Sequence, residues 1–288
     1  LTYKLVDDTI LGKLYKKGGC AMFKSIKDTV KLSNGVEMPV FGLGVWMAED
    51  ADELVEAIKC AVKTGYISID TAMQYGNEKA VGRGIKECGV NRKDLFITSK
   101  MLNQYQKERD IKGMIDGFEE TLDNLGLDYL DLYLMHWPLN ENKKFIEAWK
   151  AMVEIYKSGK VRAIGVCNCE PHNIEDMYAA TGVMPMVNQC ECHPFLNQKE
   201  LRAYCREKGI QFESYSPLMH GMLAEMPEVA EIGKKYGKTP AQIILRWHLQ
   251  HGNVIIPKSV HAERIVENSQ IFDFELTGKE MEYIDSQN

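Results

Sequence analysis

Four side chains in this sequence have the chemistry to act together on one proton. Asp70, Lys100 and His136 each end a short apolar run, and Tyr75 follows Asp70 by five positions. In an α/β barrel the strand interior is packed and only the carboxyl end opens to solvent, so ionisable residues at strand ends are placed for catalysis. The order of these residues therefore predicts an active site built from several strand ends.

The chemistry that this set could perform is proton donation. Tyrosine has an ordinary pKa of about 10, which a neighbouring lysine would lower by stabilising the phenolate. A carboxylate would hold that lysine charged, and a histidine could hydrogen-bond a substrate oxygen and orient it. Together these groups would protonate an oxygen that is gaining negative charge. Because no side chain here supplies electrons, a reduction would need a cofactor as the source of hydride.

The composition is that of an ordinary globular enzyme. The chain has 288 residues, 45% of them hydrophobic and 26% charged, and a formal net charge of -6. This acidic balance gives no electrostatic reason to expect nucleic acid or an anionic membrane as a partner. No apolar stretch approaches the roughly 18 residues of a membrane helix. The eight cysteines, without a secretory signal, predict free thiols in a reducing compartment, so we expect a cytoplasmic protein.

Residues 1–22 are set apart from the rest of the chain. They include Lys13, Lys16 and Lys17 and a Gly-Gly pair but lack the continuous apolar core of a secretory signal, and Met22 is a candidate natural start. We interpret 1–22 as a leader that is vector-derived or disordered. Residues 23–288 are expected to form one domain, since α/β barrels of about 250 residues routinely do so.

The remaining chain alternates short apolar runs with amphipathic helical patterns. The eight candidate strands are Val40 to Leu43, Ile67 to Ile69, Leu95 to Thr98, Tyr129 to Met135, Val161 to Val166, Met186 to Gln189, Ile210 to Tyr215 and Val254 to Ile256. Helical patterns between them include Ala51 to Lys63, Asp110 to Leu125, Phe145 to Lys157 and Lys199 to Lys208.

Eight βα units favour a closed parallel (β/α)8 TIM barrel of the α/β class. A doubly wound sheet is the alternative, but it usually has a Gly-x-Gly-x-x-Gly turn after its first strand, and the run from Gly42 to Met47 lacks the third glycine. The segment Thr29 to Met38, with Ser33-Asn34-Gly35 at its centre, predicts an N-terminal β-hairpin before the barrel.

Seven motifs in a fixed order resemble those of the aldo-keto reductases over nearly all of the chain between Thr29 and Asp285. The motifs are Gly42-Leu43-Gly44, Asp70-Thr71-Ala72 with Tyr75 and Asn77-Glu78, Lys100, His136-Trp137-Pro138, Val187-Asn188-Gln189, Tyr215-Ser216-Pro217-Leu218 and Ile256-Pro257-Lys258-Ser259. The chain is most similar to the short-looped bacterial type, which acts on small aldehydes and keto sugars. The resemblance implies that Tyr75 is the general acid, that Lys100 and Asp70 tune it, and that His136 orients the carbonyl.

The resemblance also implies a binding site for NADPH. Tyr215 corresponds to the aromatic residue that stacks on the nicotinamide, and Asn168 and Gln189 correspond to the residues that hydrogen-bond its carboxamide. Ser216 and Leu218 fall in the loop that covers the pyrophosphate. A lysine, a hydroxyl and an arginine are suitable donors to a ribose phosphate, which favours NADPH over NADH. This end of the site would contain Lys258, Ser259, Arg264, Glu267 and Asn268.

The substrate implied by the resemblance is a small carbonyl compound, reduced by a monomeric enzyme. Trp46 and Trp137 follow Gly44 and His136 closely and are candidates for the substrate pocket. A cofactor-binding regulatory or structural protein of the same fold, with little turnover, is the alternative function. The intact set of four catalytic residue types argues against it.

Two Cys-x-Cys pairs, Cys167 with Cys169 and Cys190 with Cys192, raise a third alternative, a thiol-based metal or redox protein. Strand residues two apart share a face without converging tightly, and structural zinc sites more often have a longer gap between paired ligands. Buried cysteine is common as a small apolar residue. We therefore predict a structural role and no metal. Cys167 and Cys169 also flank Asn168 where the family usually has Ser-Asn-Phe, and a thiol is a weaker hydrogen-bond partner than a hydroxyl.

Overall fold

The computed structural model describes residues 23–219, 221–222 and 226–288, so the leader predicted for 1–22 lies outside the described residues. Eight parallel strands form one sheet whose neighbours follow chain order. The strands are β3 (Leu43–Gly44), β4 (Ser68–Asp70), β5 (Phe96–Met101), β6 (Leu130–Met135), β7 (Val161–Cys167), β8 (Val187–Glu191), β9 (Gln211–Tyr215) and β10 (Val254–Ile255).

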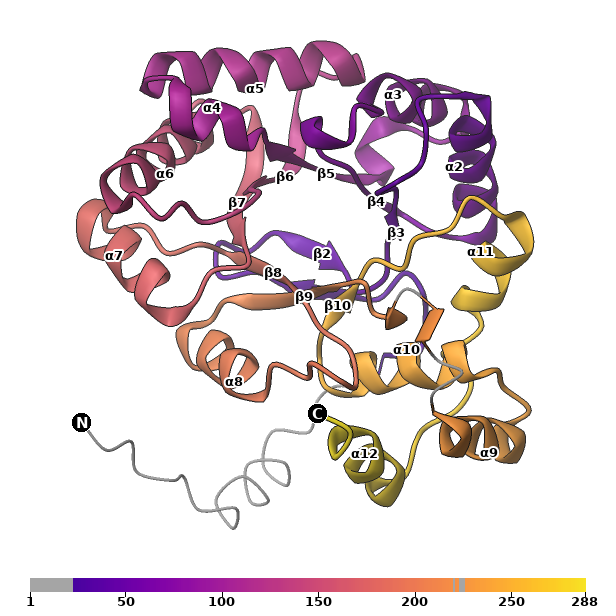
Figure 1. Cartoon of the computed structure of the whole chain (residues 1–288). Helices are drawn as coiled ribbons and strands as arrows, with labels where there is room; N and C mark the ends of the chain where they lie inside the picture. Colours follow the sequence, from indigo (N-terminus) through magenta and orange to yellow (C-terminus); the bar gives the residue numbers. More distant parts are fainter. Residues whose placement is uncertain (1–22, 220, 223–225) are drawn as a thin grey trace, which may run out of the picture.

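Backbone contacts between the first and last strands close this sheet into a ring (Figure 1). The amide of Gly42 donates to Ile255 O at 2.9 Å, and the amide of Gly44 donates to Pro257 O at 3.2 Å. A Cβ on Gly44 would lie 2.6 Å from Ile256 O, so only glycine permits this close approach. The predicted (β/α)8 barrel is confirmed, and the doubly wound alternative is wrong.

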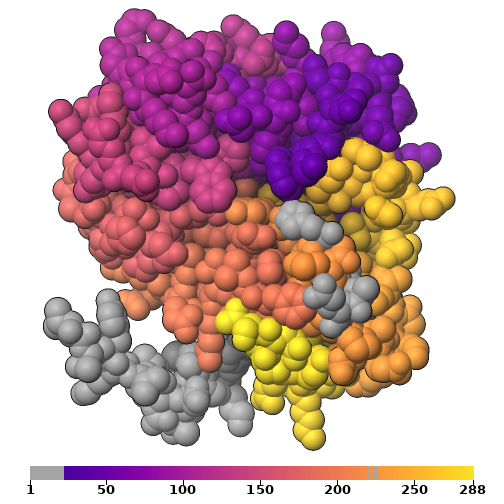
Figure 2. Space-filling view, viewed as in Figure 1, coloured from indigo at the N-terminus to yellow at the C-terminus, as the bar shows by residue number. Residues whose placement is uncertain are grey.

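Helices surround the barrel (Figure 1). They are α2 (Asp52–Thr64), α3 (Glu78–Glu87), α4 (Asn103–Glu108), α5 (Ile111–Leu125), α6 (Asn142–Lys157), α7 (Pro171–Thr181), α8 (Lys199–Lys208), α9 (Pro227–Tyr236), α10 (Pro240–Gln250), α11 (Ala262–Ser269) and α12 (Gly278–Asp285). In α2 the buried apolar stripe is formed by Leu54, Ile58 and Ala61, which belong to the hydrophobic core. The space-filling view shows side chains where the ribbon leaves a gap (Figure 2), as expected for a packed barrel.

The predicted N-terminal hairpin is present and lies at the amino end of the barrel strands. Strands β1 (Thr29–Lys31) and β2 (Glu37–Pro39) pair antiparallel, and Gly35 in the connecting turn has a φ of 89°. The side chain of Asn34 donates to Arg162 O at 2.8 Å, near the start of β7. The opposite end, where the strands finish, is left for the functional site.

Strand boundaries differ from the sequence prediction at two informative places. The first strand is Leu43–Gly44 rather than Val40 to Leu43, because the stretch before it pairs with the last strand only through isolated contacts such as Ile255 N to Val40 O at 3.1 Å. Strand β5 runs past Thr98 to Met101, since buried neighbours on β4 and β6 hold the polar residues there. Lys100 therefore lies within a strand.

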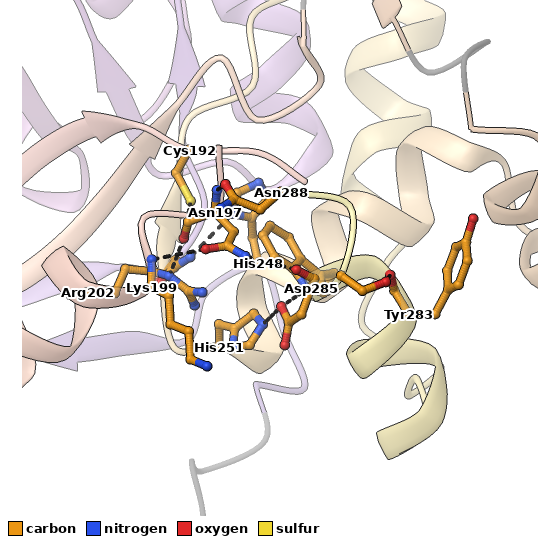
Figure 3. A network of polar contacts seen from close by, with 12 residues as sticks. Cys192, Asn197, Lys199, Arg202, His248, His251, Tyr283, Asp285 and Asn288 are labelled. Carbon is orange, nitrogen blue, oxygen red and sulfur yellow. Dashed lines mark hydrogen bonds and ion pairs between the residues drawn. The ribbon is translucent and has the colours of Figure 1, made fainter. Parts of the chain in front are cut away.

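The C-terminal helix α12 is attached to the barrel by a polar network (Figure 3). Asp285 Oδ1 accepts from Trp247 Nε1 at 2.9 Å and lies 2.8 Å from His251 Nε2. Asn197, in the loop before α8, donates its side-chain N–H to Asp285 O at 3.0 Å. Because Trp247 and His251 belong to α10 and its end, these contacts hold α12 against that helix.

One cluster of buried apolar side chains extends from Phe23 to Ile284. Within the ranges that the structure describes, every helix is too short or too polar to cross a bilayer. The monomeric state and the cytoplasmic location stay predictions.

Candidate active site

The fold brings the four predicted catalytic side chains to the carboxyl end of neighbouring strands. Asp70 is the last residue of β4, Lys100 is near the end of β5, and His136 directly follows β6. Tyr75 ends a single 3-10 turn, Met73–Tyr75, that begins just beyond β4. Strands that are adjacent and parallel end at the same edge, so residues far apart in the chain become neighbours here.

Asp70, Lys100 and Tyr75 form a continuous polar chain. Lys100 Nζ donates to Asp70 Oδ1 at 2.6 Å, to Thr71 O at 2.9 Å and to the Tyr75 hydroxyl at 3.3 Å. The Lys100 side chain is 0% exposed and that of Asp70 is 3% exposed. Burial, the largest single influence, would lower the pKa of Lys100, but the charge and hydrogen bond of Asp70, together with the Tyr75 and Cys167 side chains, outweigh it and raise the pKa above its ordinary value. Lys100 is therefore a fixed cation beside the phenol.

Burial determines the acidity of Tyr75. It raises the pKa of Tyr75 to about 12, while the charge of Lys100 acts in the opposite direction. Lys100 lowers the pKa of Tyr75, as the sequence predicts, but the loss of water around the phenol, which the sequence does not show, is the larger effect. Tyr75 is thus a protonated group at neutral pH, with a cation in place to stabilise its phenolate.

His136 lies beside Tyr75. The two ring centroids are 5.6 Å apart and meet edge to face. Burial, and secondarily the charge of Lys100, lowers the pKa of His136 to about 3. The imidazole is consequently neutral at physiological pH, and it can exchange hydrogen bonds with an oxygen without bringing a second positive charge.

A cavity of about 970 Å³ opens over these residues. All of the predicted site residues except Lys100 and Ser259 line it. Lys100 is buried beneath its wall, and Ser259 is also buried, its Oγ accepting the His261 amide at 3.1 Å. The two tryptophans, Trp46 and Trp137, are 47% and 46% exposed and border the same cavity.

The cavity reaches from the four-residue cluster to a pair of cations. Lys258 and Arg264 line it, as do Glu267 and Asn268. Both cationic side chains are exposed. Glu267 accepts from Thr239 Oγ1 at 2.7 Å, which fixes its carboxylate between α10 and α11.

The same cavity is lined by Tyr215 and by the amides on β8 and after β7. The hydroxyl of Tyr215 donates to Asn168 Oδ1 at 3.0 Å. Gln189 Nε2 donates to Asp70 Oδ2 at 2.9 Å and to Glu213 Oε2 at 2.8 Å. The amides are thus already fixed by protein contacts.

Four non-glycine residues with positive φ lie at or beside this cavity. Met47, Asn168, Ser216 and Met219 have φ between 49° and 58°. Such conformations cost on the order of 1 kcal/mol or more and cluster at binding sites. Ser216 and Met219 flank Leu218, so the strained backbone belongs to the loop that borders the cavity.

Glu213 is a site residue that the sequence reasoning missed. Its carboxylate is 1% exposed and reaches the same Gln189 amide that Asp70 holds. A signal was available, because strand residues two apart share a face and Glu213 precedes Tyr215 by two positions.

The four cysteines of the Cys-x-Cys pairs are packed inside the protein. Cys167, Cys169, Cys190 and Cys192 are all buried. Burial raises the pKa of each thiol, so they are uncharged at neutral pH. Among the residues that the structure describes, no three or more Cys, His, Asp or Glu side chains are grouped so that they could hold a metal ion.

Comparison with known proteins agrees with this geometry. The sequence model of the aldo/keto reductase family matches residues 40–288. The chain is 52% identical over 264 residues to the glyoxal reductase of Bacillus subtilis (strain 168), covering 92% of this chain and 94% of that protein. It is 45% identical over 254 residues to the methylglyoxal reductase DkgA of Escherichia coli (strain K12), covering 88% and 90%.

A solved structure gives the same result for the fold. A mutant of Gox0644 in complex with NADPH has a TM-score of 0.85 and 39% identity, covering 91% of this chain and 93% of that one. With a parallel barrel, a buried Asp70–Lys100 pair beside Tyr75 and a family match over most of the sequence, the chain belongs to the aldo/keto reductase family.

Proposed function

We propose that this protein reduces small aldehydes or ketones to alcohols with NADPH, and that Tyr75 is the proton donor. The observation that carries the proposal is the contact of the Tyr75 hydroxyl with Lys100 Nζ at 3.3 Å, beside His136 and at one end of a cavity that reaches two exposed cations. A phenol, a buried cation and a neutral imidazole around one position suit an oxygen that becomes an alkoxide.

Tyr75 is protonated at neutral pH, so it holds the proton that the product alcohol needs. As the proton leaves, negative charge develops on the phenol oxygen, where Lys100 Nζ is already in place. Asp70 keeps Lys100 charged and oriented. No large rearrangement is needed to stabilise the phenolate, which is the advantage of a fixed electrostatic environment.

His136 acts as the orienting group for the substrate oxygen. Its neutral imidazole hydrogen-bonds the carbonyl oxygen and places it against the Tyr75 hydroxyl. A positively charged histidine beside Lys100 would be costly, and the protein avoids it by burial.

The residues of the cavity fit NADPH, which when bound supplies the hydride. Tyr215 offers an aromatic face next to the four-residue cluster, and Asn168 and Gln189 offer amides for a carboxamide. Lys258 and Arg264, which also line the cavity, are suited to a ribose phosphate, a group that NADH lacks. The volume of about 970 Å³ is at the upper end of the usual range for ligand sites, as a dinucleotide requires.

The substrate is a small carbonyl compound that enters between the two tryptophans. Trp46 and Trp137 are about half exposed at the cavity, and the adjoining Met47 is 72% exposed. The names of the relatives, glyoxal reductase and methylglyoxal reductase, favour short dicarbonyl aldehydes. Such substrates bury little surface, so an open and largely preformed cavity entrance is sufficient for them.

The test is NADPH oxidation by the full chain with a panel of carbonyls: glyoxal, methylglyoxal, a longer aliphatic aldehyde, an aromatic aldehyde and a keto sugar. We expect turnover with the short aldehydes and loss of it in Tyr75→Phe. NADPH binding without turnover on every substrate would instead support the regulatory alternative. Absence of both binding and turnover would overturn the proposal.

A further inference from the structure

Glu213 is a buried carboxyl group that the proposed chemistry does not use. It lies on β9, is 1% exposed, and its Cα partner on the neighbouring strand β8 is Gln189. Carboxylates are almost never buried to this degree without a partner that offsets their loss of water. The partner here is an amide, because Gln189 Nε2 donates to Glu213 Oε2 at 2.8 Å.

The same amide nitrogen has a second acceptor on the other side of the barrel. Gln189 Nε2 donates to Asp70 Oδ2 at 2.9 Å, so both of its hydrogens are used. Glu213 and Asp70 present carboxyl oxygens, which accept hydrogen bonds, and this chemistry selects the orientation in which nitrogen faces them. The oxygen Oε1 is left on the opposite side, where it accepts a weak hydrogen bond at 3.9 Å from the thiol of Cys167, a residue that lines the cavity.

Two anchors constrain this amide more than one could. With Asp70 as the one acceptor, the amide would keep more freedom to rotate about the Cγ–Cδ bond of Gln189. A second acceptor outside that axis fixes the plane of the amide and hence the direction of Oε1. Glu213 supplies this second acceptor from a strand, which is a rigid support.

We propose that Glu213 is a positioning residue for the nicotinamide: by accepting the second N–H of Gln189, it holds Gln189 Oε1 toward the cavity as an acceptor for the carboxamide N–H₂. This rests on the proposed NADPH-dependent function. A carboxamide held by its amino group has a defined ring face, so Glu213 acts on hydride transfer without contacting the cofactor.

An uncharged carboxyl group would serve equally well in this role. Burial, reinforced by the nearby Asp70 charge, raises the pKa of Glu213. A protonated carboxyl still accepts through its carbonyl oxygen, as a glutamine would. Glu213→Gln is therefore the conservative variant, and Glu213→Leu is the variant that removes the acceptor at similar volume.

The test is a double-mutant cycle on NADP⁺ binding, measured by titration calorimetry with the full chain. Glu213→Leu should weaken NADP⁺ by about threefold to tenfold, the loss expected for one hydrogen-bonding anchor, and Glu213→Gln should restore binding. In a Gln189→Leu background, Glu213→Leu should have no further effect, because the amide through which it acts is gone. Adenosine 2′,5′-bisphosphate, which has no nicotinamide, should bind equally to the four proteins of the cycle: wild type, Glu213→Leu, Gln189→Leu and the double variant.

Equal weakening of NADP⁺ by Glu213→Leu with and without Gln189 would overturn the proposal, as would equal weakening of the nicotinamide-free ligand. If Glu213→Leu does not fold, Glu213→Met takes its place in the same cycle. Because binding of NADP⁺ needs no turnover, these outcomes are separate from the failure of the proposed function, which would appear as a wild-type protein that binds NADP⁺ but reduces no carbonyl.

Discussion

Lys100 Nζ lies 3.3 Å from the hydroxyl of Tyr75 and 2.6 Å from Asp70 Oδ1, with the lysine side chain fully buried. One cation therefore serves two oxygens, a permanent anion and a phenol that becomes an anion when it gives up its proton. In water such a contact would contribute little electrostatic stabilisation. In this buried site, solvent and salt do not screen the charges.

Tyr75→Phe should remove most turnover, because the phenol is the group that holds the transferable proton in the proposed mechanism. Loss of a positioned acid costs about a hundredfold or more. The dissociation constant of NADPH should stay within about twofold, since Phe keeps the ring. Steady-state rates and cofactor titrations check both statements, and wild-type rates in the variant would refute the assignment of Tyr75.

Lys100→Met should act on the pH dependence of the reverse reaction, alcohol oxidation with NADP⁺, which needs the phenolate. Burial holds the pKa of Tyr75 at about 12 even though Lys100 lowers it, so removing the lysine raises that pKa further. Each unit reduces the phenolate fraction about tenfold, or about 1.36 kcal/mol. The rate of alcohol oxidation should fall, and the pH at which this rate increases should become more alkaline. Lys59→Met, in a surface pair with Glu56, is the control, and a profile unchanged by Lys100→Met would exclude the electrostatic role.

Asp70→Asn should destabilise the fold, because it leaves the buried Lys100 without its counter-charge. Removing one partner of a buried ion pair costs about 3 to 5 kcal/mol. The matched control is Asp52→Asn, which breaks a surface pair with Arg83 whose aspartate is 92% exposed; there solvent screens the charges, so the expected cost is much smaller. Denaturant unfolding of both variants gives the comparison. Equal costs would mean that Lys100 does not carry its charge inside the protein.

His136→Asn should change how stability responds to acid. Burial lowers the pKa of His136 to about 3, whereas an unfolded histidine titrates at about 6.5. Between these values the unfolded state binds more protons, so His136 lowers the free energy of unfolding as the pH falls from about 6.5 toward about 3. Asn does not titrate. As the pH falls through this window, the free energy of unfolding of the variant should therefore rise relative to that of wild type by about 1 kcal/mol per pH unit. Parallel pH curves of unfolding free energy would contradict the prediction.

Arg264→Ala should weaken NADPH far more than NADH, because only NADPH has a phosphate on its adenosine ribose for the exposed guanidinium at the cavity. A charge-assisted contact contributes about 1.5 to 3 kcal/mol, which corresponds to about tenfold or more. Arg83→Ala, on α3 and outside the cavity lining, controls for loss of a surface charge. If Arg264→Ala weakened the binding of both cofactors equally, the binding site of the ribose phosphate would have to lie elsewhere.

The sequence predicted the barrel and the edge at which the candidate site lies. Apolar runs alternating with amphipathic patterns indicate βα units, and Asp70, Lys100 and His136 follow or end those runs. Because parallel strands end at one edge, their order along the chain was enough to place them near one another. Short strands were less predictable: β3 is only Leu43–Gly44, and its pairing with the last strand depends on how the sheet closes.

What the sequence alone determined is which groups are available and on which end of the barrel they gather. Only the tertiary structure decided how they behave, because acidity and orientation depend on burial and on contacts between distant segments. Tyr75 has a raised pKa because water is excluded from it, although a lysine lies beside it. Glu213 shares Gln189 with Asp70 because β4 and β8 face each other across the closed barrel, a relationship that no local pattern encodes.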